Sequence, residues 1–224
     1  MRKYFLSFGL LLTMSLATVV FNSCGKDDDN PSNPNNSNNP SGSLTTDVGV
    51  MINGIKWATR NVDKPGTFTA KPEDPGMFYQ WNSKVGWKYN EPLTPSDGTS
   101  TWDNSWNGND ATTWEKANDP CPAGWRMPSQ GELNALKYSG SVWTTRNSMN
   151  GREFGSDFNT LFLPAAGCRY SNGTLTNTGS VSEYWSSTQY NSSQAYFLYS
   201  YSSNAILSDN GLKMSGLPCR CVAE

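Results

Sequence analysis

Alternation of apolar and polar positions predicts several short strands. Residues 50–52 and 55–60 flank Asn53-Gly54, a dipeptide that favours the positive φ angles of a two-residue hairpin turn. Residues 77–81 form another short apolar run, and the segment 195–222 ends in alternating positions typical of strands. These patterns predict a hairpin near residue 53 and further strands that reach the last residues of the sequence.

One helix is predicted by a capping signal at Ser129. Ser129 and Glu132 have the spacing of a capping box, in which the hydroxyl and the carboxylate bond free amides at a helix start. Apolar residues follow at helical spacing, and Gly140 ends the pattern. Residues 113–118 carry a weaker helical pattern within 82–120, which we otherwise expect to be a long loop pinned by tryptophans. The elements together predict an α+β fold.

The first 23 residues have the pattern of a secretory signal peptide. A basic start is followed by an apolar run and by small polar residues just before Cys24. A transmembrane anchor is the alternative, but serines and threonines interrupt the run. Residues 21–24 resemble the lipobox of bacterial lipoproteins, in which the cysteine is lipidated and becomes the new amino terminus. We therefore expect a signal peptide over 1–23 and a lipid on Cys24.

Residues 24–43 have the composition of a tether. The segment 25–43 has no apolar residue and cannot bury surface, so we expect a disordered coil with a reach of roughly 25 Å. Lys26-Asp27-Asp28-Asp29 resembles the surface-export signal of Bacteroidetes lipoproteins, although a solvated acidic tether is the simpler alternative. The expected location is the outer membrane, exposed at the cell surface. Residues 44–224 contain no second linker and are predicted to form one domain.

Charge and composition exclude several function classes. The chain has 224 residues, with 17 Lys and Arg, 19 Asp and Glu, and no His. An acidic chain lacks the basic footprint that nucleic acid requires, so we expect no nucleic-acid partner. Without histidine there is no Ser-His-Asp or Cys-His catalysis and no His-ligated metal. Nine Trp, ten Tyr and nine Phe instead indicate a folded domain with an aromatic core.

Four cysteines remain besides Cys24. An even number of cysteines in an exported chain favours disulfides. Cys219 and Cys221 are too close along an extended strand to bond to each other, so two bridges are expected to run from Cys121 and Cys168 to the last strand. A Cys₄ zinc site or a redox site is the alternative.

Five segments, taken together and in order, resemble a known family: residues 52–62, 121–129, 162–167, 184–187 and 216–222. They are similar to the Fibrobacter succinogenes major paralogous domain, which is abundant in Bacteroidetes surface lipoproteins. The resemblance covers nearly all of 48–224. It implies a C-type-lectin-like fold, with a small twisted antiparallel sheet, two helices and long loops. It further implies a Cys121–Cys221 bridge and an additional Cys168–Cys219 bridge, but no activity.

The segment 182–210 is the strongest candidate for a binding surface. Of its 29 residues nine are Ser, five Tyr and three Asn, a mixture that supplies aromatic contact area and adaptable hydrogen bonds in antibody paratopes. An ordinary exposed β-rich tail is the alternative. The expected partner is an extracellular glycan or a protein. The predicted binding residues, which include one from the Trp-rich loop, are Tyr190, Asn191, Tyr196, Tyr199, Tyr201, Asn204 and Trp106.

Relatives of the same fold imply a further property. In phage tropism determinants and similar lipoproteins, a retroelement diversifies the carboxy-terminal lectin-like segment, and residues 189–210 fit such a variable region. Calcium is a weaker expectation. Residues 103–110 are rich in oxygen ligands, but Trp114 stands where an EF-hand loop carries its bidentate Glu, so we expect no metal.

No enzyme activity is expected. The carboxylates that a glycosidase would need have no spacing that brings two of them together, and the catalytic cysteine pair of formylglycine-generating enzymes has no counterpart. The alternative function is a structural surface-coat component without a discrete ligand site. The sequence predicts neither the ligand nor the oligomeric state.

Overall fold

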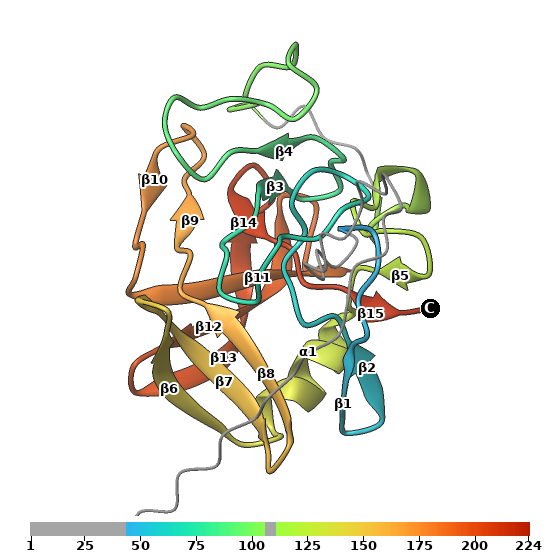
Figure 1. Ribbon diagram of the computed structural model, residues 1–224. Helices are drawn as coiled ribbons and strands as arrows, with labels where there is room; N and C mark the ends of the chain where they lie inside the picture. Colours follow the sequence, from blue (N-terminus) through green and yellow to red (C-terminus); the bar gives the residue numbers. More distant parts are fainter. Residues whose placement is uncertain (1–43, 106–110) are drawn as a thin grey trace, which may run out of the picture. The chain divides into compact units, whose positions relative to one another are not determined.

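Antiparallel strands are the main regular secondary structure of the computed structural model, which describes residues 44–105 and 111–224 (Figure 1). The expected signal peptide, Cys24 and tether lie outside the described residues. Within them there are fifteen strands, one α-helix and one 3₁₀ turn. The strands are β1 (Val50–Ile52), β2 (Ile55–Trp57), β3 (Phe78–Gln80), β4 (Gly86–Trp87), β5 (Trp125–Arg126), β6 (Ser141–Arg146), β7 (Met149–Ser156), β8 (Asn159–Pro164), β9 (Cys168–Arg169), β10 (Leu175–Thr176), β11 (Val181–Gln189), β12 (Gln194–Tyr201), β13 (Asn204–Leu212), β14 (Gly216–Pro218) and β15 (Val222–Ala223).

The prediction of an α+β, C-type-lectin-like fold with two helices is wrong. The second expected helix is only the 3₁₀ turn Lys116–Asn118, which buries no residue. Its amino-terminal cap, Glu115, makes no side-chain capping bond. A short segment with neither a cap nor a buried face cannot offset the cost of starting a helix. The fold is instead a set of antiparallel sheets with a single helix.

The predicted helix at Ser129 is confirmed as α1 (Gln130–Lys137). Both halves of the capping box are present: Ser129 accepts a hydrogen bond from the Glu132 amide, and the Glu132 carboxylate accepts one from the Ser129 amide. Arg126 also pairs with Glu132 at 2.6 Å, which ties the helix start to β5. Leu133 and Leu136 form the buried face of the helix.

The strands form four sheets, and the last strands of the sequence join two of them. The sheet orders are β1-β2-β15-β5, β10-β9-β14-β3-β4, β11-β12-β13 and β6-β7-β8. The expected hairpin at Asn53-Gly54 links β1 to β2, and both turn residues have positive φ, 50° and 78°. β15 lies beside β2, and β14 pairs with β3 (Figure 1). Pairing of the last residues with early strands therefore closes the fold.

The β11-β12-β13 sheet separates two hydrophobic clusters. On one face Trp185 and Phe197 pack into a cluster with Trp81. On the other face Tyr184 and Leu198 pack into a second cluster that holds α1. Alternate residues of one strand point to opposite faces of a sheet, so a single strand can serve both clusters. Packing on both faces holds the sheet in place, and this positions the side chains that extend from it to the surface.

One of the two expected disulfides is formed. Cys121 and Cys221 are bonded across a sequence separation of 100 residues. Cys168 and Cys219 are buried free thiols, so the predicted Cys168–Cys219 bridge is wrong. Arg169 pairs with Gly216 between β9 and β14, and the antiparallel register therefore brings Leu217 opposite Cys168 instead of Cys219. Burial raises the pKa of both thiols.

Candidate functional site

One face of the β11-β12-β13 sheet brings together three of the predicted binding residues. Tyr199 and Tyr201 lie on the same side of β12, two residues apart. Asn204 is the partner of Tyr201 on β13, and Ile206 is the partner of Tyr199. Tyr199 and Tyr201 are half-buried, whereas Asn204 and Ile206 are exposed. We call these four residues the tyrosine face.

Aromatic rings continue from the core to the tyrosine face. The ring centroids of Trp185 and Phe197 lie 6.0 Å apart, and those of Phe197 and Tyr199 lie 6.3 Å apart, both pairs edge to face. Tyr199 and Tyr201 follow at 5.5 Å with an interplanar angle of 51°. Trp185 is fully buried and donates its indole N–H to the Tyr79 carbonyl at 2.7 Å. The outer tyrosines are therefore held against a fixed aromatic base.

A buried carboxylate lies next to this ring series. Glu183 on β11 is the partner of Tyr199, and only 8% of its surface is exposed. Among the described residues no lysine or arginine forms an ion pair with it. Burial raises the pKa of Glu183, and burial followed by the charge of Glu183 raises the pKa of Tyr199. A carboxylate held among rings can accept hydrogen bonds from a ligand that reaches it.

Glu183 is not among the binding residues predicted from the sequence. The signal was present, because Val181, Glu183 and Trp185 alternate on one strand face with two apolar residues around an acid. An acid at a core-facing position of a strand is unusual, since burial of a charge is costly. The position of Glu183 on the apolar face of the strand is therefore the signal that could have identified it.

The other predicted binding residues that the structure describes lie outside the tyrosine face. Tyr196 points to the opposite face of β12 from Phe197, and its ring meets that of Tyr190 at 5.5 Å and 81°. Asn191 is engaged in the β11–β12 turn, where its side-chain oxygen accepts the amides of Ser193 and Gln194. Trp106 lies outside the described residues. The predicted set is thus divided between the tyrosine face and a separate Tyr190–Tyr196 pair.

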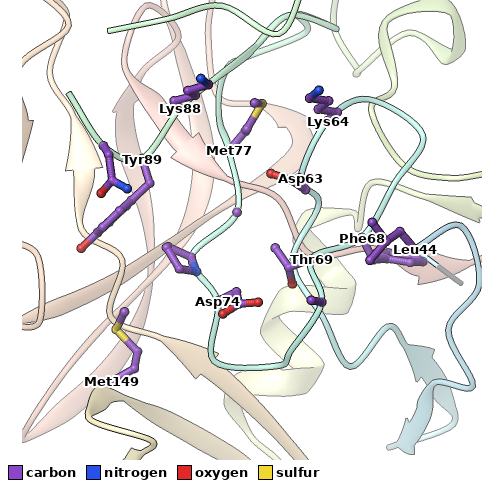
Figure 2. A pocket seen from close by; sticks show the side chains of 14 residues that line it. Leu44, Asp63, Lys64, Phe68, Thr69, Asp74, Met77, Lys88, Tyr89 and Met149 are labelled. Carbon is purple, nitrogen blue, oxygen red and sulfur yellow. The ribbon is translucent and has the colours of Figure 1, made fainter. Parts of the chain in front are cut away.

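A cavity of about 590 Å³ is lined by none of the predicted site residues that the structure describes (Figure 2). It is formed by the loop before β3, by residues after β4 and by the start of β7. The segments are far apart in sequence, and no local motif marks them. Its lining residues are Leu44, Asp63, Lys64, Phe68, Thr69, Ala70, Asp74, Pro75, Gly76, Met77, Lys88, Tyr89, Asn90 and Met149.

Residues 44–105 and 111–224 contain neither a metal-ligating cluster nor a membrane-spanning helix. This part of the chain has no group of three or more Cys, Asp or Glu side chains placed to hold a metal ion. Of the expected oxygen-rich loop only 103–105 is described, and there Asp103 accepts the Ser105 amide in a local turn. The same described residues include no helix with the length and apolarity needed to cross a bilayer.

Comparison with known proteins adds no further assignment. No protein-family model, curated protein or solved structure matches the chain.

Proposed function

We propose that this chain is a cell-surface lipoprotein whose tyrosine face binds an extracellular glycan. The observation that carries the proposal is the series Phe197–Tyr199–Tyr201, which leads from the core to a partly exposed surface beside Glu183. Tyrosine offers a large contact area at low cost in conformational entropy, and its hydroxyl offers a hydrogen bond. Attachment to the membrane rests on the signal and lipobox pattern of residues 1–24.

The chemistry of the face favours a sugar. The apolar side of a sugar ring can stack on Tyr201 while its hydroxyls donate to the Glu183 carboxylate or bond to the Asn204 amide. Glu183 has lost most of its hydration and keeps a hydrogen bond with the Cys168 thiol, so a sugar hydroxyl would add a further donor to its carboxylate. An extracellular protein is the alternative partner, and the test below includes it.

Tyr201 is the best residue for a test. Tyr199 packs against the core, so its truncation would lower stability as well as binding. Tyr201 belongs to none of the hydrophobic clusters and is half-buried. Tyr138, at the end of α1, is 72% exposed and supplies a matched control on another part of the surface.

The experiment is a glycan array and a cell-surface panel probed with the full chain and the Tyr201→Ala and Tyr138→Ala variants. The proposal expects a saturable glycan signal that falls about tenfold or more with Tyr201→Ala, a loss typical of a central aromatic contact, and not with Tyr138→Ala. Binding to a cell-surface protein without binding to any glycan would show that the ligand is a protein and not a glycan. Binding unchanged in Tyr201→Ala would refute the site.

Diversification of residues 189–210 is a separate part of the proposal. The tyrosine face can change without loss of the fold only at exposed or half-buried positions, whereas Leu198 and Ser200 are buried between the sheet and its neighbours. Sequencing of this locus across isolates should find substitutions at Tyr199, Tyr201 and Asn204, with Leu198 constant. Substitutions spread equally over buried and exposed positions of 189–210, or no substitutions at all, would argue against diversification.

A further inference from the structure

The cavity in Figure 2 carries four charged side chains that do not pair with one another. They are Asp63, Lys64, Asp74 and Lys88. Within residues 44–105 and 111–224 none of them forms an ion pair. Among the described residues, the Asp74 carboxylate accepts a hydrogen bond only from the Lys71 amide, at 2.9 Å. Cationic and acidic side chains that line one cavity without pairing with each other can form ion pairs with a ligand that has both a negative and a positive group.

The charges are separated along the cavity. Figure 2 shows Lys64 and Lys88 at its upper end and Asp74 at its lower end, with Asp63 between them. Apolar and aromatic side chains line much of the rest of the cavity. Phe68 and Met77 are buried there, Met149 approaches from the start of β7, and Tyr89 stacks on Phe78 at 6.0 Å and 13°. The cavity thus has a cationic end with Lys64 and Lys88, an acidic end with Asp74, and Asp63 among apolar and aromatic side chains between them.

The walls are fixed by contacts of their own. The Met77 amide donates to the Val62 carbonyl at 3.1 Å, and the Asn61 side chain donates to the Pro75 carbonyl at 2.9 Å. Gly76 has φ of +70°, and a Cβ there would lie 2.2 Å from the Val62 oxygen, so only glycine allows this close turn. The Asn147 side chain also bonds to Glu73, which ties the β6–β7 turn to the same loop. These contacts make a preformed site.

We propose that this cavity binds a zwitterionic ligand with an apolar body, namely a peptide of two or three residues with free ends. Its carboxylate would lie near Lys64 and Lys88, and its ammonium near Asp74. A purely apolar ligand would remove water from four charges without compensating them, and a simple anion would face the two acids as well. The volume of about 590 Å³ is in the range of small-molecule sites. This inference is independent of glycan binding at the tyrosine face.

The test is calorimetric titration of the full chain with leucyl-phenylalanine, its N-acetyl form and its C-terminal amide. We expect one saturable site for the free dipeptide and affinity at least about tenfold lower for each blocked form. Lys88→Met should reduce the difference between the free acid and the amide. Asp74→Asn keeps an acceptor for the Lys71 amide and should reduce the difference between the free amine and the acetyl form.

Two controls separate this site from others. Lys84→Met removes an exposed lysine outside the cavity and should leave the dipeptide affinity unchanged. Tyr201→Ala should also leave it unchanged, whereas Lys88→Met should leave glycan binding intact. No binding of di- or tripeptides by a chain whose thermal unfolding is cooperative would overturn the proposal. So would equal affinity for free and blocked peptides, or loss of peptide binding in Tyr201→Ala.

Discussion

Removal of the Cys121–Cys221 disulfide should cause the largest loss of stability available from one covalent change. Cys221 precedes β15, which pairs with β2 and β5, and Cys121 lies just before β5. The bridge therefore connects the last strand to the middle of the chain. Without it, the unfolded chain regains the freedom of a very long loop.

The magnitude follows from the sequence separation of 100 residues. In the chain-entropy model a loop of this length corresponds to about 4.7 kcal/mol of stabilisation. For a domain of this size, 1 kcal/mol shifts the Tm by roughly 2–4 °C, so the expected fall is roughly 10–20 °C. Total stabilities of about 5–15 kcal/mol make this a substantial fraction of the whole.

The assay is thermal unfolding of the Cys121→Ala/Cys221→Ala double variant beside the wild-type chain, each with and without a reducing agent. Reduction should lower the Tm of the wild type to that of the double variant and leave the double variant unchanged. Alkylation of the unfolded, unreduced chain should label Cys168 and Cys219, the two buried free thiols. A Tm change below about 3 °C, or a double variant still sensitive to reduction, would refute this reasoning.

Three further predictions concern single residues. Burial raises the pKa of Glu183, so this acid opposes folding increasingly as pH rises through its folded-state pKa. Glu183→Gln should therefore raise the Tm at pH 8 and much less at pH 4. Glu115→Gln, at an exposed position, should show no such pH dependence. Ser129→Ala removes the α1 cap and should cost about 1 kcal/mol in urea unfolding; no change would argue against the capping role. Gly167 has φ of +73°, and a Cβ there would lie 2.1 Å from the Thr176 oxygen, so Gly167→Ala should cost at least about 1 kcal/mol; a neutral result in the same titration would contradict that close contact.

Local signals in the sequence predicted local structure correctly. The Asn53-Gly54 hairpin and the Ser129–Glu132 capping box each depend on residues a few positions apart, and both are formed. The Cys121–Cys221 bridge, implied by family resemblance, is also present. By contrast, the second helix was predicted from a weak pattern at 113–118 that has no cap or buried face.

The candidate sites depend on contacts that no local pattern reveals. Tyr199 and Tyr201 share a face because of strand alternation, but the place of Tyr196 opposite them depends on which cluster buries Phe197. The partnership of Glu183 with Tyr199 depends on the β11–β12 register. The cavity joins residue 63, residue 88 and residue 149, which only the folded chain brings together.

Hydrogen–deuterium exchange of the full chain, with and without the strongest glycan from the array, tests the central claim most directly. Bound glycan should slow exchange in peptides that cover Gln194–Leu212, the two strands that carry the tyrosine face. Peptides around the cavity loop, residues 63–77, should exchange unchanged. Protection confined to that loop, or no protection anywhere despite saturating glycan, would contradict the assignment of binding to the tyrosine face.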